Sequence, residues 1–119
     1  MAHEIVEIRD DVIIVRLSGL LQRTDMTALQ ELALQLIGLG KRLRLLAILE
    51  NFQGWDKHDD WNDIGFLMEY GDDFAKMAFV GDEKWKDDAF LFVGKGFRAT
   101  EIEFFPPTAL RNAERWLQS

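Results

Sequence analysis

The chain has 119 residues, of which 48% are hydrophobic and 29% are charged, and its formal net charge is −7. This length allows one hydrophobic core and is too short for two ordinary domains. The absence of cysteine excludes disulfides, thiolate metal sites and a cysteine nucleophile, and the excess of acidic residues argues against generic nucleic-acid binding, because phosphates would be repelled.

The first forty residues predict a β-hairpin followed by a helix. Apolar and β-branched residues indicate strands over 4–8 and 12–17 with a turn at Asp10-Asp11, and Ser18-Gly19 is expected to end the second strand. Thr24 or Asp25 is expected to cap a helix over 24–39, which the glycines at 38 and 40 then stop.

The middle of the chain predicts a central strand and two further helices. Residues 42–50 are almost continuously apolar, which is typical of a strand buried on both faces. A loop over 51–58 is expected next, and then a helix over 59–70 whose acidic start suits a helix N-terminus. Residues 74–80 predict another strand and residues 83–93 another helix.

The end of the chain predicts one more strand and a terminal helix. The strand covers 100–105 and is stopped by Pro106-Pro107; the helix covers 108–117 and has an inward stripe of Ala109, Leu110, Ala113, Trp116 and Leu117. The order β-β-α-β-α-β-α-β-α predicts an α/β fold with a mostly parallel five-stranded sheet and right-handed crossovers. With no internal repeat and no linker, we expect a single domain over 1–119.

Several segments resemble one known family. They are 52–56 (FQGWD), Trp61, 77–85 (MAFVGDEKW), 103–105 (EFF) and 113–117 (AERWL). Together with the order of elements, they make almost the whole chain resemble the SpoIIAA-like family of small bacterial proteins, which is similar to STAS domains and anti-sigma-factor antagonists. The resemblance implies a STAS-type fold and a regulatory module that docks a protein partner. The same topology also resembles lipid-carrying CRAL-TRIO domains, in which an apolar helix covers a hydrophobic cavity.

One feature of the regulatory relatives is missing. In STAS antagonists a Ser in the loop after the central strand is phosphorylated, which adds a charge of roughly −2 at a helix start. Here residues 50–55 read ENFQGW, and the only serines are Ser18 and Ser119. The sequence therefore predicts that any partner docks without a phospho-serine switch.

Aromatic residues predict a ligand pocket. Trp55 and Trp61 lie near the carboxyl end of the predicted central strand, where open α/β sheets bind ligands. The predicted ligand-binding residues are Trp55, Trp61, Phe66, Trp85 and Phe92. The alternative interpretation is that these are ordinary core aromatics.

The segment 84–98 predicts a gate or an interfacial helix. Residues 89–93 are five consecutive apolar residues, which on a helix point in every direction and cannot all face one core. Four basic and two acidic residues accompany them, and Gly94 and Gly96 are candidate hinges. The predicted gate and membrane-contact residues are Phe90, Leu91, Val93, Lys95, Phe97 and Arg98. A deep groove or a homodimer contact is the alternative.

The sequence predicts neither an enzyme nor a metal site. His58 with Asp56, Asp59 and Asp63 offers metal-ligand types, but acidic residues at a helix start have a simpler role as a solvated N-terminus. There is no Ser at a strand-to-helix elbow and no phosphate-binding loop, so no catalytic residue and no cofactor are predicted.

The leading prediction is a non-enzymatic protein that holds a small apolar or lipid-like molecule and touches a membrane peripherally through the 85–97 helix. The alternative is a protein–protein interaction module, and a homodimer is a third reading of the same apolar segment. The start of the chain shows no signal peptide and no stretch approaches the ~18 apolar residues of a membrane span, so a cytoplasmic location is expected.

Overall fold

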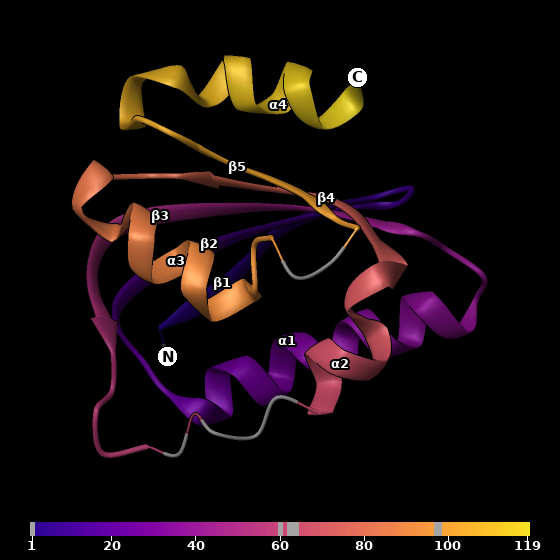
Figure 1. Cartoon of the computed structure of the whole chain (residues 1–119), viewed down its shortest axis with the longest axis horizontal. Coiled ribbons are helices and arrows are strands. Elements are labelled where there is room, and N and C mark those ends of the chain that lie inside the picture. Colours follow the sequence, from indigo (N-terminus) through magenta and orange to yellow (C-terminus); the bar gives the residue numbers. More distant parts are fainter. Residues whose placement is uncertain (1, 60, 62–64, 97–98) are drawn as a thin grey trace.

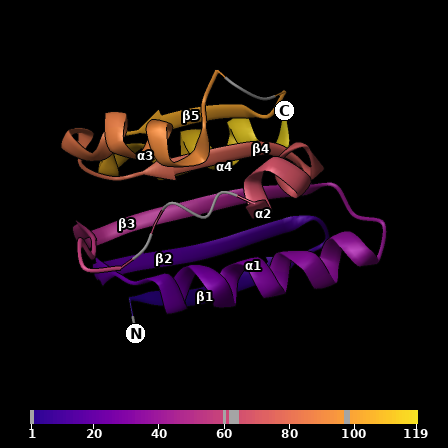
Figure 2. The same ribbon diagram turned by 60° about the horizontal axis from the view of Figure 1, so that its bottom comes forward.

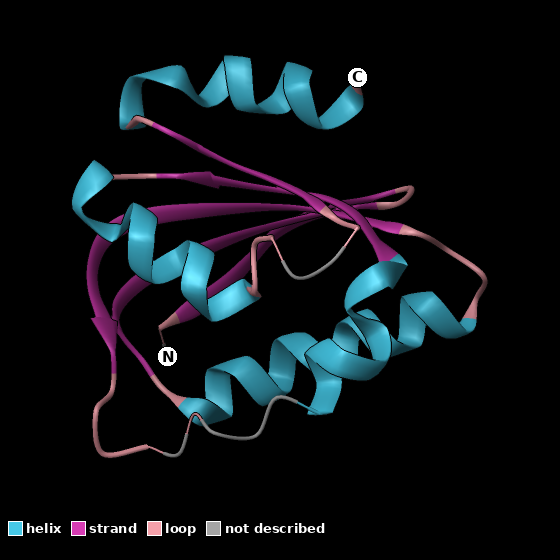
Figure 3. Ribbon diagram, viewed as in Figure 1, coloured by secondary structure: helices cyan, strands magenta, loops and turns pink. Residues whose placement is uncertain are grey.

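The computed structural model describes residues 2–59, 61, 65–96 and 99–119. Within them the chain forms five strands and four α-helices, in the predicted order and of the predicted α/β class (Figure 1, Figure 3). Three short 3₁₀ turns, Gly71–Asp73, Glu83–Trp85 and Pro107–Ala109, precede β4, α3 and α4. The elements are β1 His3–Arg9, β2 Val12–Leu21, α1 Arg23–Gly38, β3 Leu43–Trp55, α2 Gly65–Tyr70, β4 Phe74–Val80, α3 Lys86–Val93, β5 Glu101–Phe105 and α4 Leu110–Gln118.

The strands lie side by side in chain order, β1-β2-β3-β4-β5. β1 pairs antiparallel with β2, and every later pair is parallel. Because the parallel strands are added in one direction, right-handed crossovers place α1, α2 and α3 on the same face of the sheet. Figure 1 shows these three helices on one face and α4, which follows the last strand, alone on the other.

Each face of the sheet has its own apolar core. On β2, Ile13 and Val15 point into the core under α1 and α3, whereas Val12 and Ile14 point into the core under α4. This alternation follows from the two-residue period of a strand. Figure 2 shows that α1 lies toward the β1–β2 side of the sheet and α3 toward the β4–β5 side.

The two central strands are longer than predicted. The expectation that Ser18-Gly19 ends β2 and that 51–58 is a loop is wrong, because β2 continues to Leu21 and β3 to Trp55. Gly19, Asn51 and Gly54 have positive φ, and register shifts between the two strands absorb these residues as irregularities. Because Gly19 pairs with Phe52 and Leu21 pairs with Trp55, these two aromatic residues belong to strand β3 and not to a loop.

Two helix starts also differ from the prediction. The N-cap of α1 is Gln22, and Asp25 sits at the third helical position, where its carboxylate accepts from the Gln22 backbone N–H at 3.0 Å. The expected helix over 59–70 is wrong at its beginning, because Asp59 and Trp61 are not helical and α2 begins at Gly65. Residues 60 and 62–64 of that expected helix lie outside the described residues.

Candidate functional site

A cavity of about 470 Å³ lies between α1, α3 and the sheet. Its floor is formed by inward-facing residues of the strands, such as Val15, Ala47 and Met77. α1 contributes Met26, Leu29 and Ala33 among others, and α3 contributes 88, 89 and 91–93. Of the described residues that line it, Arg23, Gln30 and Asp88 alone have polar side chains apart from the two indoles. The site is therefore an apolar chamber with a few polar groups on its helical walls.

Four of the five predicted ligand residues line this one cavity. They are Trp55 at the end of β3, Trp61, Phe66 at the start of α2, and Phe92 on α3. Trp85 is not among the described lining residues. Its ring instead packs behind the wall, 5.1 Å from Phe52 and 6.3 Å from Trp55 between ring centroids.

The aromatic residues form a connected wall with mostly edge-to-face contacts. Ring centroids are 5.3 Å apart for Phe52 and Trp55, 5.4 Å for Trp55 and Phe92, and 5.6 Å for Trp61 and Phe92. These separations fall in the range in which aromatic pairs attract. Rings from β3, α3 and the segment after β3 thus hold one another at the carboxyl end of the sheet.

Gly54 allows the close packing of this wall. Its φ is +100°, and a Cβ built there would lie 3.2 Å from the Trp85 ring. A side chain at this position would therefore face both backbone strain and contact with the indole. The Gly54-Trp55 pair and Trp85, both part of the family resemblance, are linked by this contact.

The two indoles in the cavity wall differ in their hydrogen bonding. Trp61 Nε1 donates to the backbone oxygen of Asp56 at 2.8 Å, which ties the segment after β3 into a compact turn. Trp55 Nε1 is buried and has no acceptor among the described residues. A buried N–H without an acceptor is unusual, because its desolvation is not offset.

Helix α3, for which the sequence predicts a gate, has one strongly exposed apolar residue. Ala89 and Val93 are buried, whereas Leu91 is 80% exposed at the rim of the cavity. Phe90 does not line the cavity and packs edge-to-face on Phe104, with 6.3 Å between ring centroids. As the helical period requires, the five apolar residues point in different directions and only part of the run belongs to the core.

The lysines of this segment lie over its own aromatic rings. Lys84 Nζ is 5.3 Å from the Trp85 centroid, and Lys95 Nζ is 4.8 Å from the Phe90 centroid. Lys86 Nζ is 5.9 Å from the same Phe90 ring, and Lys95 also donates to the carbonyl of Ile102. These cation–π contacts hold the ammonium groups close to the protein.

The predicted hinge glycines both have left-handed backbone. Gly94 ends α3 with φ +74°, and Gly96 has φ +92°. Such conformations are readily adopted by glycine alone. Phe97 and Arg98, which were predicted as gate residues, lie outside the described residues.

The acidic segment after β3 is bound to backbone groups. Asp56 accepts from the His58 N–H at 2.9 Å, and Asp59 accepts from the Arg23 N–H at 2.8 Å. No group of three or more potential metal ligands occurs among residues 2–59, 61, 65–96 and 99–119. Asp63, the fourth residue weighed as a ligand, lies outside those ranges.

Several wall residues were missed at the level of sequence. Phe52, Leu21 and Met26 line the cavity, but the first two fall where a loop and a strand end were expected. Phe52 and Gly54 are buried and Gln53 between them is exposed, which is the two-residue period of a strand. The sequence conceals this period, because Gly54 is typical of a strand end.

The fold and cavity define a small α/β domain with a sequentially ordered, mostly parallel sheet and an apolar site that opens to the surface at Leu91. The SpoIIAA-like family model matches residues 12–118. The chain belongs to the SpoIIAA-like family, and its STAS-type fold is that of the family.

A solved structure supports the same fold. It is that of an uncharacterised protein from Shewanella loihica PV-4 with a SpoIIAA-like fold. The two chains are 23% identical, the similarity covers 98% of this chain and 92% of the other, and the TM-score is 0.65. No curated protein matches the chain. Among the described residues, no helix has the length and apolar character needed to cross a membrane.

Proposed function

We propose that this protein is a non-enzymatic carrier or sensor that holds a small apolar molecule in the cavity between α1 and α3. The observation that carries the proposal is the cavity itself, with a volume of about 470 Å³ and a largely apolar lining. Small-molecule sites commonly have volumes of roughly 300–1,000 Å³. Protein interiors are otherwise packed with few voids, so a bound molecule would supply the contacts that these walls lack.

The side chains of the lining favour binding over catalysis. The described lining contains a single carboxylate, Asp88, and no hydroxyl, thiol or imidazole side chain. A nucleophile with a neighbouring base is the usual requirement for covalent catalysis. These features support a role in holding a molecule.

The direct test is native mass spectrometry of the gently purified protein, followed by organic extraction. A retained apolar molecule at one per chain is the expected result. The second arm measures uptake of the neutral fluorescent probe N-phenyl-1-naphthylamine by Phe92→Asp, which places a carboxylate in the cavity wall. Phe90→Asp is the matched control, because Phe90 lies on the same helix but does not line the cavity. Equal probe uptake by the two variants would contradict the proposal.

The proposal includes a brief contact between α3 and a membrane surface while the ligand enters or leaves. It is supported by Leu91, which is 80% exposed at the cavity rim, and by the presence of Lys84, Lys86 and Lys95 in the same segment, a composition typical of interfacial helices. Flotation with vesicles of neutral and anionic lipid tests it. Leu91→Asp is expected to reduce co-flotation, and Leu34→Asp on α1 is the control; unchanged flotation of Leu91→Asp argues against membrane contact.

The alternative function is a STAS-type protein interaction module. It is favoured by membership of the SpoIIAA-like family and by the same exposed Leu91. In this case Leu91→Asp abolishes capture of a stoichiometric protein partner from native lysate, whereas Phe92→Asp inside the cavity leaves capture intact. A captured complex that carries no apolar molecule would favour this function over the carrier.

A homodimer is the third reading; the sequence places its contact on the apolar 89–93 run, and β1 offers a second surface for it. The outer edge strand β1 has exposed apolar residues Ile5, Val6 and Ile8, and such edges pair readily with other chains. Sedimentation velocity over a hundredfold concentration range separates this case, because a specific dimer persists at the lowest concentration.

A further inference from the structure

The ligand's chemistry is constrained by the unpaired indole in the cavity wall. Trp55 and Trp61 both line the cavity, and each is in contact with the Phe92 ring. Trp61 Nε1 has an acceptor in Asp56, whereas Trp55 Nε1 has none among the described residues. A buried donor of this kind gains from any acceptor that a ligand brings. An indole N–H donates only, so the group that it recognises must be an acceptor.

The surroundings of Trp55 indicate that the acceptor has to come from the ligand. Its ring is in contact with Phe52, Trp85 and Phe92, at centroid distances of 5.3 Å, 6.3 Å and 5.4 Å. None of these neighbours has an acceptor in its side chain. The nitrogen is covered in the structure, so this hydrogen bond requires that a neighbouring ring turn aside before a ligand acceptor can reach it. Side-chain rearrangements of this size are common on binding.

Anionic ligands are disfavoured at the same end of the cavity. A helix N-terminus is the usual place for an anion, but the protein's own carboxylates already use the one on α1. Asp59 accepts from the Arg23 N–H at 2.8 Å, and Asp25 accepts from the Gln22 N–H at 3.0 Å. An incoming carboxylate or phosphate therefore finds these donors occupied and negative charges beside them.

Helix α3, the second helix at the cavity, also has carboxylates at its N-terminus. The first turn of α3 carries Asp87 and Asp88, and Asp88 lines the cavity. Arg23 is the one cation among the described lining residues, and it already has a further interaction partner. The polar groups around the cavity thus oppose a negative head group.

We infer that the cavity takes an uncharged molecule with an apolar body and one hydrogen-bond acceptor, such as a ketone, ester or ether oxygen, to which Trp55 Nε1 donates. This inference rests on the proposed carrier function and gives it a ligand class. It distinguishes the cavity from a site for fatty-acid carboxylates or phospholipid phosphates. The aromatic wall supplies the affinity for the body of the ligand, and the indole selects the acceptor.

The test compares three naphthalene probes of similar size by isothermal titration calorimetry at neutral pH. They are 2-acetylnaphthalene, 2-ethylnaphthalene and 2-naphthoate. The ketone is expected to bind about three- to tenfold more tightly than the hydrocarbon, which is the net effect of one neutral hydrogen bond. 2-Naphthoate is expected to bind about tenfold or more weakly than the ketone.

Two variants assign the preference to Trp55. Trp55→Phe removes the N–H, so the advantage of the ketone over the hydrocarbon should fall to about twofold or less. Trp61→Phe is the matched control, because its N–H is already used within the protein, and it should keep the ketone preference. The ratio of the two affinities corrects for any change in cavity volume.

A measurement on the unaltered protein tests the inference even if a variant fails to fold. The indole ¹H–¹⁵N resonance of Trp55, assigned by substituting the other three tryptophans, should shift downfield with 2-acetylnaphthalene and not with 2-ethylnaphthalene. If both probes bind equally and the resonance does not move, or if 2-naphthoate binds as tightly as the ketone, the inference is overturned and the carrier function stands. If none of the three probes binds, the carrier function fails together with the inference.

Discussion

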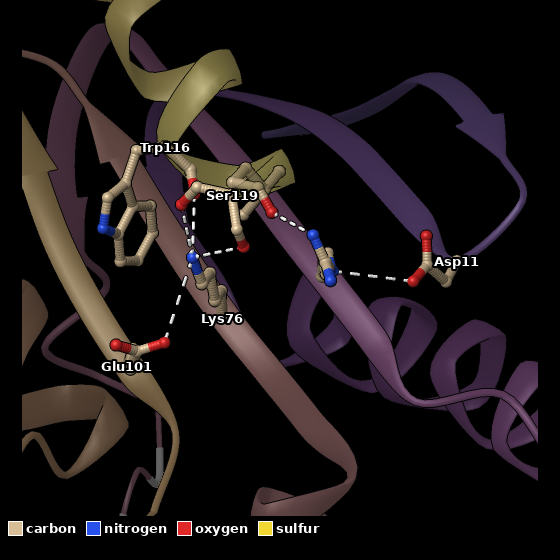
Figure 4. A network of polar contacts seen from close by, with 7 residues as sticks. Asp11, Lys76, Glu101, Trp116 and Ser119 are labelled. Atoms are coloured by element: carbon tan, nitrogen blue, oxygen red, sulfur yellow. Dashed lines mark hydrogen bonds and ion pairs between the residues drawn. The ribbon is translucent and has the colours of Figure 1, made fainter.

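The ammonium of Lys76 donates to the carbonyl of Trp116 at 2.9 Å and lies 4.8 Å from the centroid of the same residue's ring (Figure 4). It also donates to the two oxygens of Ser119, at 2.9 Å and 2.8 Å. Arg44 donates to the carbonyl of Leu117 beside it. Two cations of the sheet therefore hold the last turn of α4, where the unpaired carbonyls and the helix dipole favour positive charge.

Replacement of Lys76 should loosen α4. Lys76→Met keeps the apolar stem but removes the charged donor to Trp116 and Ser119 and the cation over the Trp116 ring, so the free energy of unfolding should fall by about 1–3 kcal/mol. Arg111→Met on the exposed face of α4 is the control and should change it by less than about 0.5 kcal/mol. Urea denaturation measures both. Equal stability of the two variants would show that Lys76 does not hold the helix.

The buried Asp25 should make stability depend on pH in the acid range. Burial raises the pKa of this carboxyl, but the hydrogen bond with His3 and those from the N–H groups of Gln22 and Ala2 outweigh it, so the pKa lies below its ordinary value of 3.8. The group therefore contributes stability above that ordinary value, and the contribution is lost as the pH falls through the lower pKa of the folded state.

Asp25→Asn tests this contribution. At pH 7 the variant should be less stable by about 1–3 kcal/mol, and the difference from the unaltered protein should shrink as the pH falls below about 4. Exposed Glu114→Gln is the control. Urea denaturation at pH 7, 5, 4 and 3 measures the difference, and a gap that stays constant across that range would refute the role of the Asp25 carboxylate.

The order of elements and the topology of the sheet could be predicted because hydrophobic periodicity and turn residues determine them. The ends of β2 and β3 could not, because Gly19 and Gly54 look like terminators in a sequence. In the structure, pairing between the two strands continues past both residues. Strand pairing is a tertiary interaction, and it overrides the local preference of glycine.

Only part of the candidate site could be predicted from the sequence. The carboxyl end of a parallel sheet gathers aromatic residues from separate segments, so Trp55, Trp61 and Phe92 could be placed together from topology. Trp85 could not be separated from them, because its position behind Phe52 depends on the close approach to Gly54. The difference between the two indole N–H groups depends on side-chain geometry, which no periodicity reveals.

Gly81 should tolerate no side chain. A Cβ built there would lie 2.7 Å from the Cβ of Leu49, so Gly81→Ala forces the end of β4 away from β3 and should lower the free energy of unfolding by about 1–3 kcal/mol. Gly38→Ala is the matched change at the end of α1, where nothing lies within 4 Å. It should raise stability by about 0.5–1 kcal/mol. Chemical denaturation measures both, and the same sign for the two substitutions would contradict this account.

A substitution that fills the cavity tests whether ligand uptake depends on the volume of the cavity. Ala47 lines the cavity from the middle of β3, and its own side chain is 1% exposed, so Ala47→Leu directs the added carbons toward the cavity. Uptake of N-phenyl-1-naphthylamine should fall about tenfold or more, because space for the probe is lost, while stability should stay level or rise by about 1 kcal/mol as the void is filled.

Ala78→Leu is the control on the opposite face. Ala78 is fully buried in the core under α4, which also contains Leu46 and Ala113, and it lines neither the cavity nor a smaller pocket beside α4. The larger side chain has no space there and should lower stability by about 1–3 kcal/mol, with no direct effect on the distant cavity. If Ala47→Leu destabilises the protein as much as Ala78→Leu does, the region around Ala47 is tightly packed in solution, and the chamber between α1 and α3 has no volume to offer a ligand.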